Sequence, residues 1–185
     1  MTAKTKSGNE IIIELPEKVE AKVEGSMIIL KSGKEENKMD ISNPQISVAI
    51  KDRSIIIASE KSTKKEKKLV FTYNAHIKNM IKGVVEGHRY ILKICSGHFP
   101  MNVSVNNNQF MKKNFIGEKH PRTLNIKKGV TVKVEGDKIT IESADIGLAG
   151  TVASDIEKLT RRPNFDPRIF QDGIYLIDKN GKEIK

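Results

Sequence analysis

An internal repeat limits the possible folds more than any other feature of this sequence. The segment from Lys22 to Ser32 is matched 111 positions later by the segment from Lys133 to Ser143, and both open with Lys-Val-Glu-Gly. The match continues upstream without a gap. Each copy alternates β-branched residues and then places glycine in a two-residue turn, which predicts a β-hairpin. We interpret the repeat as a domain duplication; the alternative is a chance likeness between two ordinary hairpins.

The residues around the two hairpins predict similar surroundings for both. In the first half, strands are expected at residues 45–51 and 54–59, followed by a helix at 64–85 with apolar residues every three or four positions. In the second half, strands are expected at 89–96 and 101–105 and a helix at 145–159, with Asp145 as its N-cap.

These patterns together predict an α+β fold. It would consist of two tandem duplicated domains, each an antiparallel β-sheet packed against one α-helix, plus a C-terminal extension. The predicted boundaries are 1–86 for the N-terminal domain, 87–162 for the C-terminal domain and 163–185 for the extension.

The net charge of +10 is distributed unevenly along the chain. Residues 1–60 carry a net charge of −1, so the remainder carries +11. The N-terminal domain is therefore expected to be a near-neutral scaffold with a basic helix start at residues 61–68. The excess beyond residue 60 favours a polyanionic partner over a small-molecule substrate.

The residue types that support catalysis or cofactor binding are poorly represented. A single cysteine, Cys95, excludes an intrachain disulfide and any zinc site with two thiolates, and the four histidines lack metal-ligand spacing. His98 lies three positions from Cys95, but sequence proximity provides no orienting third group, so we interpret Cys95 as a packed structural residue. The sequence has no phosphate-binding glycine motif. We therefore expect no enzyme activity, cofactor or metal.

Membrane association is also not expected from the sequence. The longest apolar runs have four residues, far fewer than the roughly 18 that a spanning helix needs. No signal-peptide pattern opens the chain, and a reducing cytoplasm fits the cysteine content.

Two basic segments mix cations with phenylalanines and favour RNA over charge that only improves solubility. They cover residues 106–128, with Phe110 and Phe115, and 158–168, with Phe165 and nearby Phe170. Arginine binds phosphate with two donors and stacks on bases, and aromatic rings offer stacking surfaces. The candidate cations are Lys112, Lys113, Lys119 and Arg122 in the first segment and Lys158, Arg161, Arg162 and Arg168 in the second.

Several blocks of the chain closely resemble one known family. They are Asn-Phe-Ile-Gly-Glu-Lys at 114–119 with Pro-Arg at 121–122, His-Phe-Pro-Met at 98–101, Asn-Ala-His-Ile-Lys-Asn-Met-Ile-Lys-Gly-Val at 74–84, and Asp-Pro-Arg-Ile-Phe-Gln-Asp-Gly-Ile-Tyr at 166–175. In this order they resemble the universal large-subunit ribosomal protein six in its archaeal form. The resemblance covers essentially the whole chain, and the family's two domains of similar topology agree with the repeat.

The resemblance implies a structural constituent of the large ribosomal subunit, located in the cytoplasm. Such a protein binds 23S-type rRNA near the base of the factor-binding stalk and the sarcin–ricin region and stabilises rRNA tertiary structure. Neighbouring ribosomal proteins at the stalk base are the expected partners, and translation-factor GTPases are within reach. The alternative function is a free RNA-binding regulator or RNA chaperone.

The same resemblance adds two glycines to the candidate site. In the family, the second domain and the C-terminal extension make most rRNA contacts. These regions correspond here to the loop around Gly117, Lys119 and Arg122 and to the segment that ends at Gly173. Either glycine would let backbone approach RNA closely, or would simply form a turn. Phe170 and Tyr175 are expected to anchor the extension to the second domain rather than to stack on bases.

Overall fold

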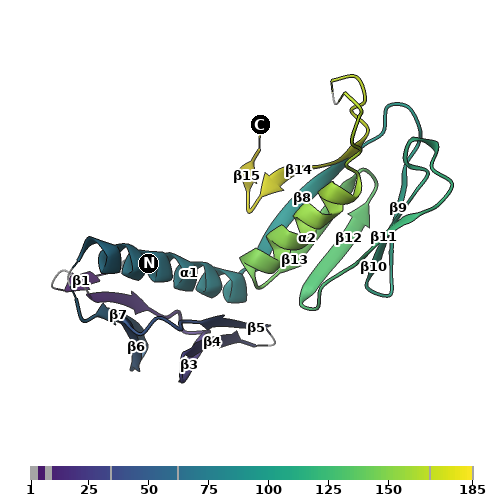
Figure 1. Ribbon diagram of the computed structural model, residues 1–185. Coiled ribbons are helices and arrows are strands. Elements are labelled where there is room, and N and C mark those ends of the chain that lie inside the picture. Colours follow the sequence, from purple (N-terminus) through teal and green to yellow (C-terminus); the bar gives the residue numbers. More distant parts are fainter. Residues whose placement is uncertain (1–3, 7–9, 34, 62, 167, 185) are drawn as a thin grey trace. The chain divides into compact units, whose positions relative to one another are not determined.

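The computed structural model describes residues 4–6, 10–33, 35–61, 63–166 and 168–184. The chain forms two compact units, residues 1–87 and 88–185 (Figure 1). In the described part of the first unit, the elements are β1 (Lys4–Lys6), β2 (Glu10–Glu14), β3 (Glu20–Glu24), β4 (Met27–Ser32), β5 (Glu35–Asp40), β6 (Ile46–Lys51), β7 (Ser54–Ser59) and α1 (Lys64–Val85).

Two antiparallel sheets and one helix enclose the core of the first unit. The strand orders are β1-β2-β7-β6 and β3-β4-β5, and α1 packs against strands of both sheets. The buried isoleucines recur every two residues on the strands and every four on the helix, as the two periodicities require. They include Ile11 and Ile13 on β2, Ile55 and Ile57 on β7, and Ile77 and Ile81 on α1.

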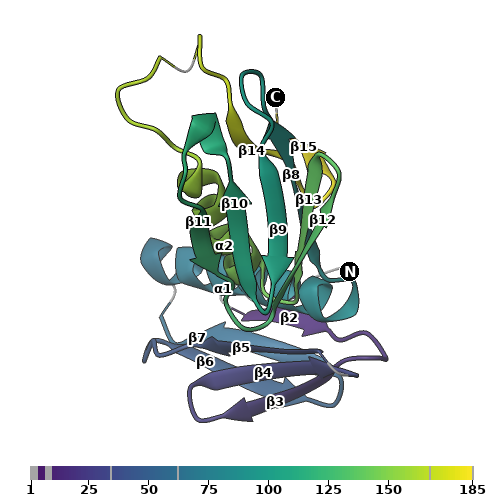
Figure 2. The same ribbon diagram turned by 90° about the vertical axis from the view of Figure 1, so that its right-hand side faces the viewer.

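The second unit has the same type of architecture. Its described elements are β8 (His88–Cys95), β9 (Asn102–Asn106), β10 (Gln109–Lys113), the short 3₁₀ helix η1 (Phe115–Gly117), β11 (Arg122–Asn125), β12 (Val130–Glu135), β13 (Lys138–Ser143), α2 (Ile146–Leu159), β14 (Gly173–Lys179) and β15 (Lys182–Glu183). The strand orders are β12-β13-β8-β14-β15 and β11-β10-β9. Figure 2 shows the smaller sheet in front of α2, which packs on strands of both sheets.

The two units share one topology, which confirms the predicted duplication. The order β2-β7-β6 corresponds to β8-β13-β12, β3-β4-β5 corresponds to β9-β10-β11, and α1 corresponds to α2. The hairpin β6–β7 is thus the counterpart of β12–β13. Their registers agree: Ile46 pairs with Ser59, and Val130 pairs with Ser143, 84 positions further along in each case.

The alignment of the copies at an offset of 111 residues is therefore wrong. It matches β3–β4, a hairpin of the three-stranded sheet, with β12–β13, a hairpin of the five-stranded sheet. Both hairpins alternate β-branched residues and turn at a glycine with positive φ, 63° at Gly25 and 58° at Gly136. Their likeness reflects the shared chemistry of a tight hairpin, whereas the true counterpart β6–β7 turns at Asp52.

The predicted helices agree closely with the observed ones. The first covers Lys64–Val85 as predicted, and the second begins one residue after Asp145, whose carboxylate accepts a hydrogen bond from the Gly147 amide at 2.7 Å. Among the described residues, no helix has both the length and the apolar character needed to cross a membrane.

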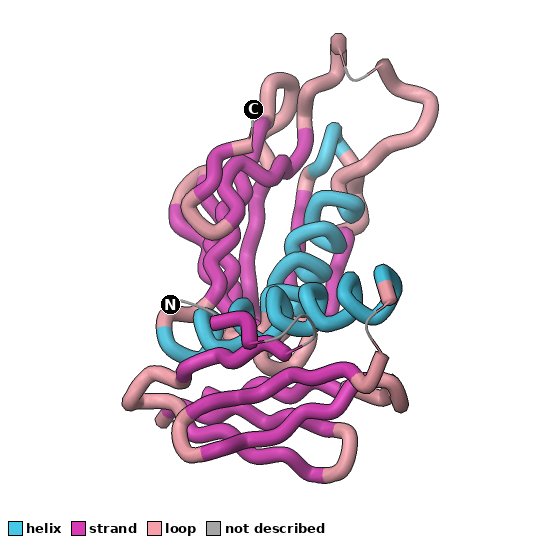
Figure 3. Tube along the Cα trace, turned by 90° about the vertical axis from the view of Figure 1, so that its left-hand side faces the viewer, coloured by secondary structure: helices cyan, strands magenta, loops and turns pink. Residues whose placement is uncertain are grey.

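The segment predicted as a C-terminal extension contributes to the sheet of the second unit. After the long loop that follows α2, seen in pink in Figure 3, β14 pairs with β8 and lies between β8 and β15. The side chain of Ile174 is completely buried in the core. This pairing fixes the position at which the loop returns to the unit.

Removing the Ile174 side chain to Cβ should test whether β14 is an integral strand. We expect Ile174→Ala to lower the free energy of unfolding by about 2–5 kcal/mol, because it leaves a cavity in the core. Urea denaturation measures this loss. The matched control is Ile184→Ala in the same C-terminal segment, where the residue is 48% exposed; its effect should stay within about 0.5 kcal/mol. Equal effects of the two substitutions would contradict the integral role of β14.

Candidate nucleic-acid interface

The two basic segments predicted from the sequence meet at one end of the second unit. The loop between β10 and β11 brings Phe115 and Ile116 to the wall of a cavity that Lys158 and Arg161 also line. The segment after α2 forms the rest of that end, and strand pairing of β14 closes it. Residues separated by some 40 positions in sequence therefore line one feature of the surface.

Arg122 connects the β10–β11 loop to the end of α2. Its Nε donates to Glu118 Oε2 at 2.8 Å, and its Nη2 donates to Glu118 Oε1. Its Nη1 donates to the carbonyl of Leu159 at 2.8 Å and to that of Arg161 at 3.4 Å. A guanidinium at this position also interacts favourably with the C-terminal end of the helix dipole. Arg122 was predicted to contact RNA, but its donors are largely used within the protein.

The carboxylate of Glu118 is fixed in its charged form by this contact. The hydrogen bonds from the Arg122 guanidinium lower the pKa of Glu118, although partial burial opposes the shift. The ion pair is half-buried, with side-chain exposures of 29% for Arg122 and 27% for Glu118. The loop is therefore held by a bidentate charge-assisted pair, the stronger class of hydrogen bond.

Lys112 is buried, which corrects the expectation that it lies on an RNA-binding surface. The residue is 1% exposed, and its Nζ lies 3.2 Å from the centre of the Phe115 ring and 3.5 Å from the Leu159 carbonyl oxygen. Burial, together with the charge of Arg122, lowers the pKa of Lys112 to about 7, and the charge of Glu118 opposes this shift. A phosphate cannot reach this ammonium group in the observed conformation.

Gly173 is also buried and does not offer its backbone to a partner. A Cβ atom at this position would lie 3.1 Å from the hydroxyl of Tyr175, so the absence of a side chain makes room for the tyrosine ring. Gly117, in contrast, is exposed and has a φ of 74° that favours glycine. Its predicted place in an accessible loop agrees with the structure.

The remaining predicted cations are accessible. Lys113, Lys119, Lys158 and Arg161 are exposed. The side chain of Arg168 is 88% exposed and pairs with Asp166, with 2.8 Å between Nη2 and Oδ2. Hydrogen bonds from Arg168 lower the pKa of Asp166, so this carboxylate stays charged beside the guanidinium.

Of the four phenylalanines of the two basic segments, two are buried and two are half-buried. Phe110 and Phe115 are 0% and 1% exposed and belong to the interior, so they offer no stacking surface. Phe165 and Phe170 are half-buried and pack edge to face, with 4.9 Å between ring centres. Half-buried Arg162 places its guanidinium carbon 4.2 Å from the centre of the Phe165 ring.

The loop at residues 96–101 is part of this end of the unit, although the sequence did not identify it as a site. Asp172 Oδ1 accepts hydrogen bonds from the backbone amides of Gly97 at 2.6 Å and His98 at 2.9 Å, and Asp172 Oδ2 bonds to His98 Nδ1. Burial raises the pKa of Asp172, but these bonds outweigh it and the pKa is lowered overall. The contact joins positions 74 residues apart, so no local pattern could predict it.

No group of three or more potential metal-ligating side chains occurs among the residues that the structure describes. The cysteine is half-buried at the end of β8. The functional potential of this end therefore rests on its exposed cations, its half-buried rings and its cavity.

The burial of Lys112 predicts a specific pH dependence of stability. The unfolded chain keeps the Lys112 proton to about pH 10, whereas the folded protein loses it near pH 7. The free energy of unfolding of the wild type, relative to Lys112→Met, should therefore rise between these values, by up to about 1.4 kcal/mol per pH unit. Urea titrations of both proteins from pH 6 to pH 10 measure the difference. A constant difference would contradict the lowered pKa.

Comparison with known proteins agrees with this structure. A family model described as ribosomal protein L6 matches residues 15–87 and again 99–173, two matches that start 84 positions apart like the equivalent strands. The large ribosomal subunit protein uL6 of Methanococcus vannielii is 41% identical over 170 residues, covering 92% of this chain and 93% of the relative. The uL6 protein of Methanobrevibacter smithii is 36% identical over 167 residues, covering 90% and 94%. The chain therefore belongs to the ribosomal protein L6 family, in its archaeal form.

Proposed function

We propose that this protein is a structural constituent of the large ribosomal subunit that binds large-subunit rRNA and has no catalytic role. The observation that carries the proposal is that two cation-rich segments come together in the second unit: the β10–β11 loop lines one cavity with exposed Lys158 and Arg161, and Arg122 donates to the carbonyl of Leu159. We call the exposed cations of these two segments the basic end; they are Lys113, Lys119, Lys158, Arg161 and Arg168. Family membership supports the proposal, because the relatives are named as large ribosomal subunit proteins.

The chemistry of the basic end suits folded RNA. Exposed lysine and arginine side chains neutralise phosphates and release counterions, and loops can follow the irregular backbone of a structured RNA. The residues beyond position 60 carry a net charge of +11, so long-range attraction also favours this part of the chain. The first unit, with a nearly neutral start, would serve mainly as a scaffold.

The finer location of the protein forms part of the proposal. We place it near the base of the factor-binding stalk and the sarcin–ricin region, in cytoplasmic ribosomes, where it would stabilise rRNA tertiary structure. Its neighbours there would be ribosomal proteins of the stalk base, with translation-factor GTPases within reach. Chemical footprinting of the protein on large-subunit rRNA tests this location directly.

A free RNA-binding regulator or chaperone is the second candidate, because the same exposed cations would serve it. Sedimentation distinguishes the two: a ribosomal constituent stays with large subunits through a moderate salt wash, whereas a free regulator is found in the light fractions. The His98–Asp172 pair favours neither a hydrolase nor another enzyme, because its hydrogen bonds fasten the 96–101 loop to the C-terminal segment.

The affinity for large-subunit rRNA should fall steeply with salt. If the basic end neutralises about four to six phosphates, a plot of log affinity against log salt concentration should have a slope of about −3 to −5. Filter-binding assays at KCl concentrations from about 50 to about 300 mM measure the slope. An affinity independent of salt would rule out the electrostatic account.

Removing two exposed cations from the basic end should weaken rRNA binding without unfolding the protein. For the double variant Lys119→Ala and Arg161→Ala we expect a salt slope shallower by about 2, one unit for each lost phosphate contact. The matched control is Lys22→Ala with Lys51→Ala, two exposed lysines of the first unit. Arg122 is unsuitable for this test because its side chain holds the loop. An unchanged slope in the first double variant would place the RNA elsewhere.

A further inference from the structure

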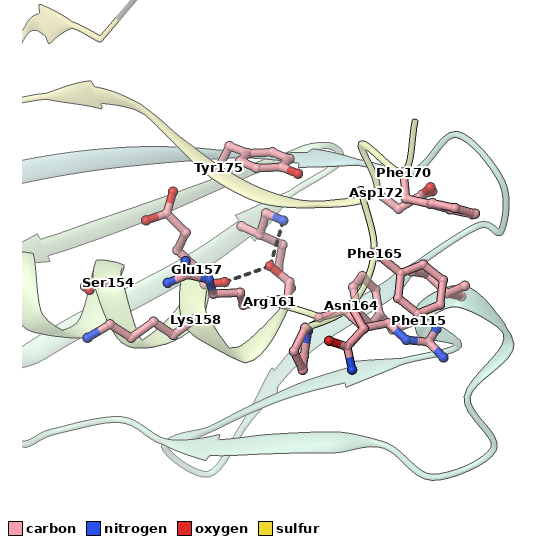
Figure 4. Close-up of a pocket in the computed structure, with 15 residues that line it drawn as sticks. Phe115, Ser154, Glu157, Lys158, Arg161, Asn164, Phe165, Phe170, Asp172 and Tyr175 are labelled. Carbon is pink, nitrogen blue, oxygen red and sulfur yellow. Dashed lines mark hydrogen bonds between the residues drawn. The ribbon is translucent and has the colours of Figure 1, made fainter. Parts of the chain in front are cut away.

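A cavity of about 600 Å³ opens within the basic end (Figure 4). Its walls come from the last turns of α2, the loop that follows, and the start of β14. Its volume lies in the range of sites that bind small organic groups. Neither phosphate neutralisation nor core packing accounts for a hollow of this size in a surface that would otherwise meet RNA.

The cavity presents aromatic surface to its interior. Figure 4 shows Tyr175 on one side and Phe165 with Phe170 toward one end. Tyr175 is 41% exposed, and its ring lies over Gly173, where a Cβ atom would crowd it. The packing of Phe170 and Arg162 on Phe165 fixes the orientation of that ring. Such fixed rings are the surfaces on which proteins stack unpaired bases.

Positive charge borders the same cavity. Lys158 and Arg161 line it, are exposed, and form no ion pair among the described residues. The two acidic residues of the lining are engaged elsewhere: Asp172 binds the 97–98 backbone, and Glu157 accepts from the Leu176 amide at 3.4 Å. With Arg162, the lining holds three cations against two carboxylates, a balance that favours an anionic group.

The polar groups of the inner wall of the cavity have hydrogen-bond partners within the protein. The hydroxyl of Thr160 donates to the Glu157 carbonyl at 2.8 Å and accepts from the Ile174 amide at 3.1 Å, as marked in Figure 4. These bonds tie the end of α2 to β14 and hold the cavity open. Exposed Asn164 also lines the cavity, and its amide offers both a donor and an acceptor for the edge of a base.

From these features we infer that the cavity receives one unpaired nucleotide of the bound RNA. Its base would lie against Phe165 and against Tyr175, for which the sequence favoured an anchoring role over base stacking. Its phosphates would meet Lys158 and Arg161. An aromatic group joined to an anion matches the combination of rings and cations better than an apolar peptide side chain does. The inference rests on the proposed RNA-binding function and adds a defined nucleotide-binding site to it.

Nuclear magnetic resonance of the full-length, ¹⁵N-labelled protein tests the cavity independently of the whole RNA. We expect AMP and UMP to shift the amide signals of residues 157–162, 164–165 and 173–176 saturably, and ribose 5-phosphate to shift them much less. The difference isolates the contribution of base stacking. Equal shifts for all three compounds, or no saturable shift with the nucleotides, would overturn the inference.

A variant that fills the cavity tests the inference in RNA binding. Ser154 lines the cavity from α2, so Ser154→Leu should block base insertion and lower the affinity for large-subunit rRNA about tenfold. The matched control is Thr151→Leu, which adds similar bulk at an exposed position of α2 outside the lining and should change the affinity less than about twofold. Tyr175→Ala provides a second variant that enlarges the cavity, and it should lower the affinity by a similar factor.

The outcomes separate this inference from the proposed function. If the wild type fails to bind large-subunit rRNA, the proposed function is wrong. If the wild type binds but Ser154→Leu and Tyr175→Ala bind equally well, the function stands and the nucleotide site is overturned. Cross-linking of the cavity residues to a ribosomal protein instead of RNA, in assembled subunits, would also overturn it. Thermal unfolding of each variant confirms that the protein remains folded.

Discussion

The contact on which the candidate interface depends is the guanidinium of Arg122 placed between a carboxylate and the end of a helix. It joins Glu118 in the β10–β11 loop to the carbonyl oxygens of Leu159 and Arg161. The contact links the start of β11 to the end of α2, the elements from which the two basic segments continue. The buried ammonium of Lys112, between the Phe115 ring and the Leu159 carbonyl, supports the same connection.

The cations of the second unit serve two different purposes. Lys112 is buried and Arg122 half-buried, and both hold the architecture, whereas Lys113, Lys119, Lys158 and Arg161 are exposed to a partner. The carboxylates of Glu118 and Asp172 also serve the architecture, because their hydrogen bonds hold loops in place. They form these bonds with Arg122 and with the backbone of His98 rather than with the exposed cations. A polyanion would therefore meet fewer charges than the sequence contains, but these charges are held by a rigid framework.

Much of the fold could be predicted because local patterns determine it. The helix at Lys64–Val85 and the hairpin at residues 130–143 follow from periodicity and turn residues alone. The duplication was also recognised, but with the wrong alignment, since a short hairpin sequence reports its turn and its alternation and not the sheet to which it belongs. Only the pairing of β13 with β8, and of β4 with β5, distinguishes the two hairpins.

The sequence by itself determined the secondary structure, the α+β class, the charge asymmetry and the family resemblance, because each depends on residues close together or on composition. Tertiary structure alone decided which basic residues are exposed and can contact a partner. Lys112 and Lys113 are neighbours in the sequence, yet strand alternation and the packing of α2, 47 residues away, bury the first and expose the second. The cavity beside Tyr175 likewise exists only because β14 returns to pair with β8, and the free energy of that pairing depends on residues distant in the chain.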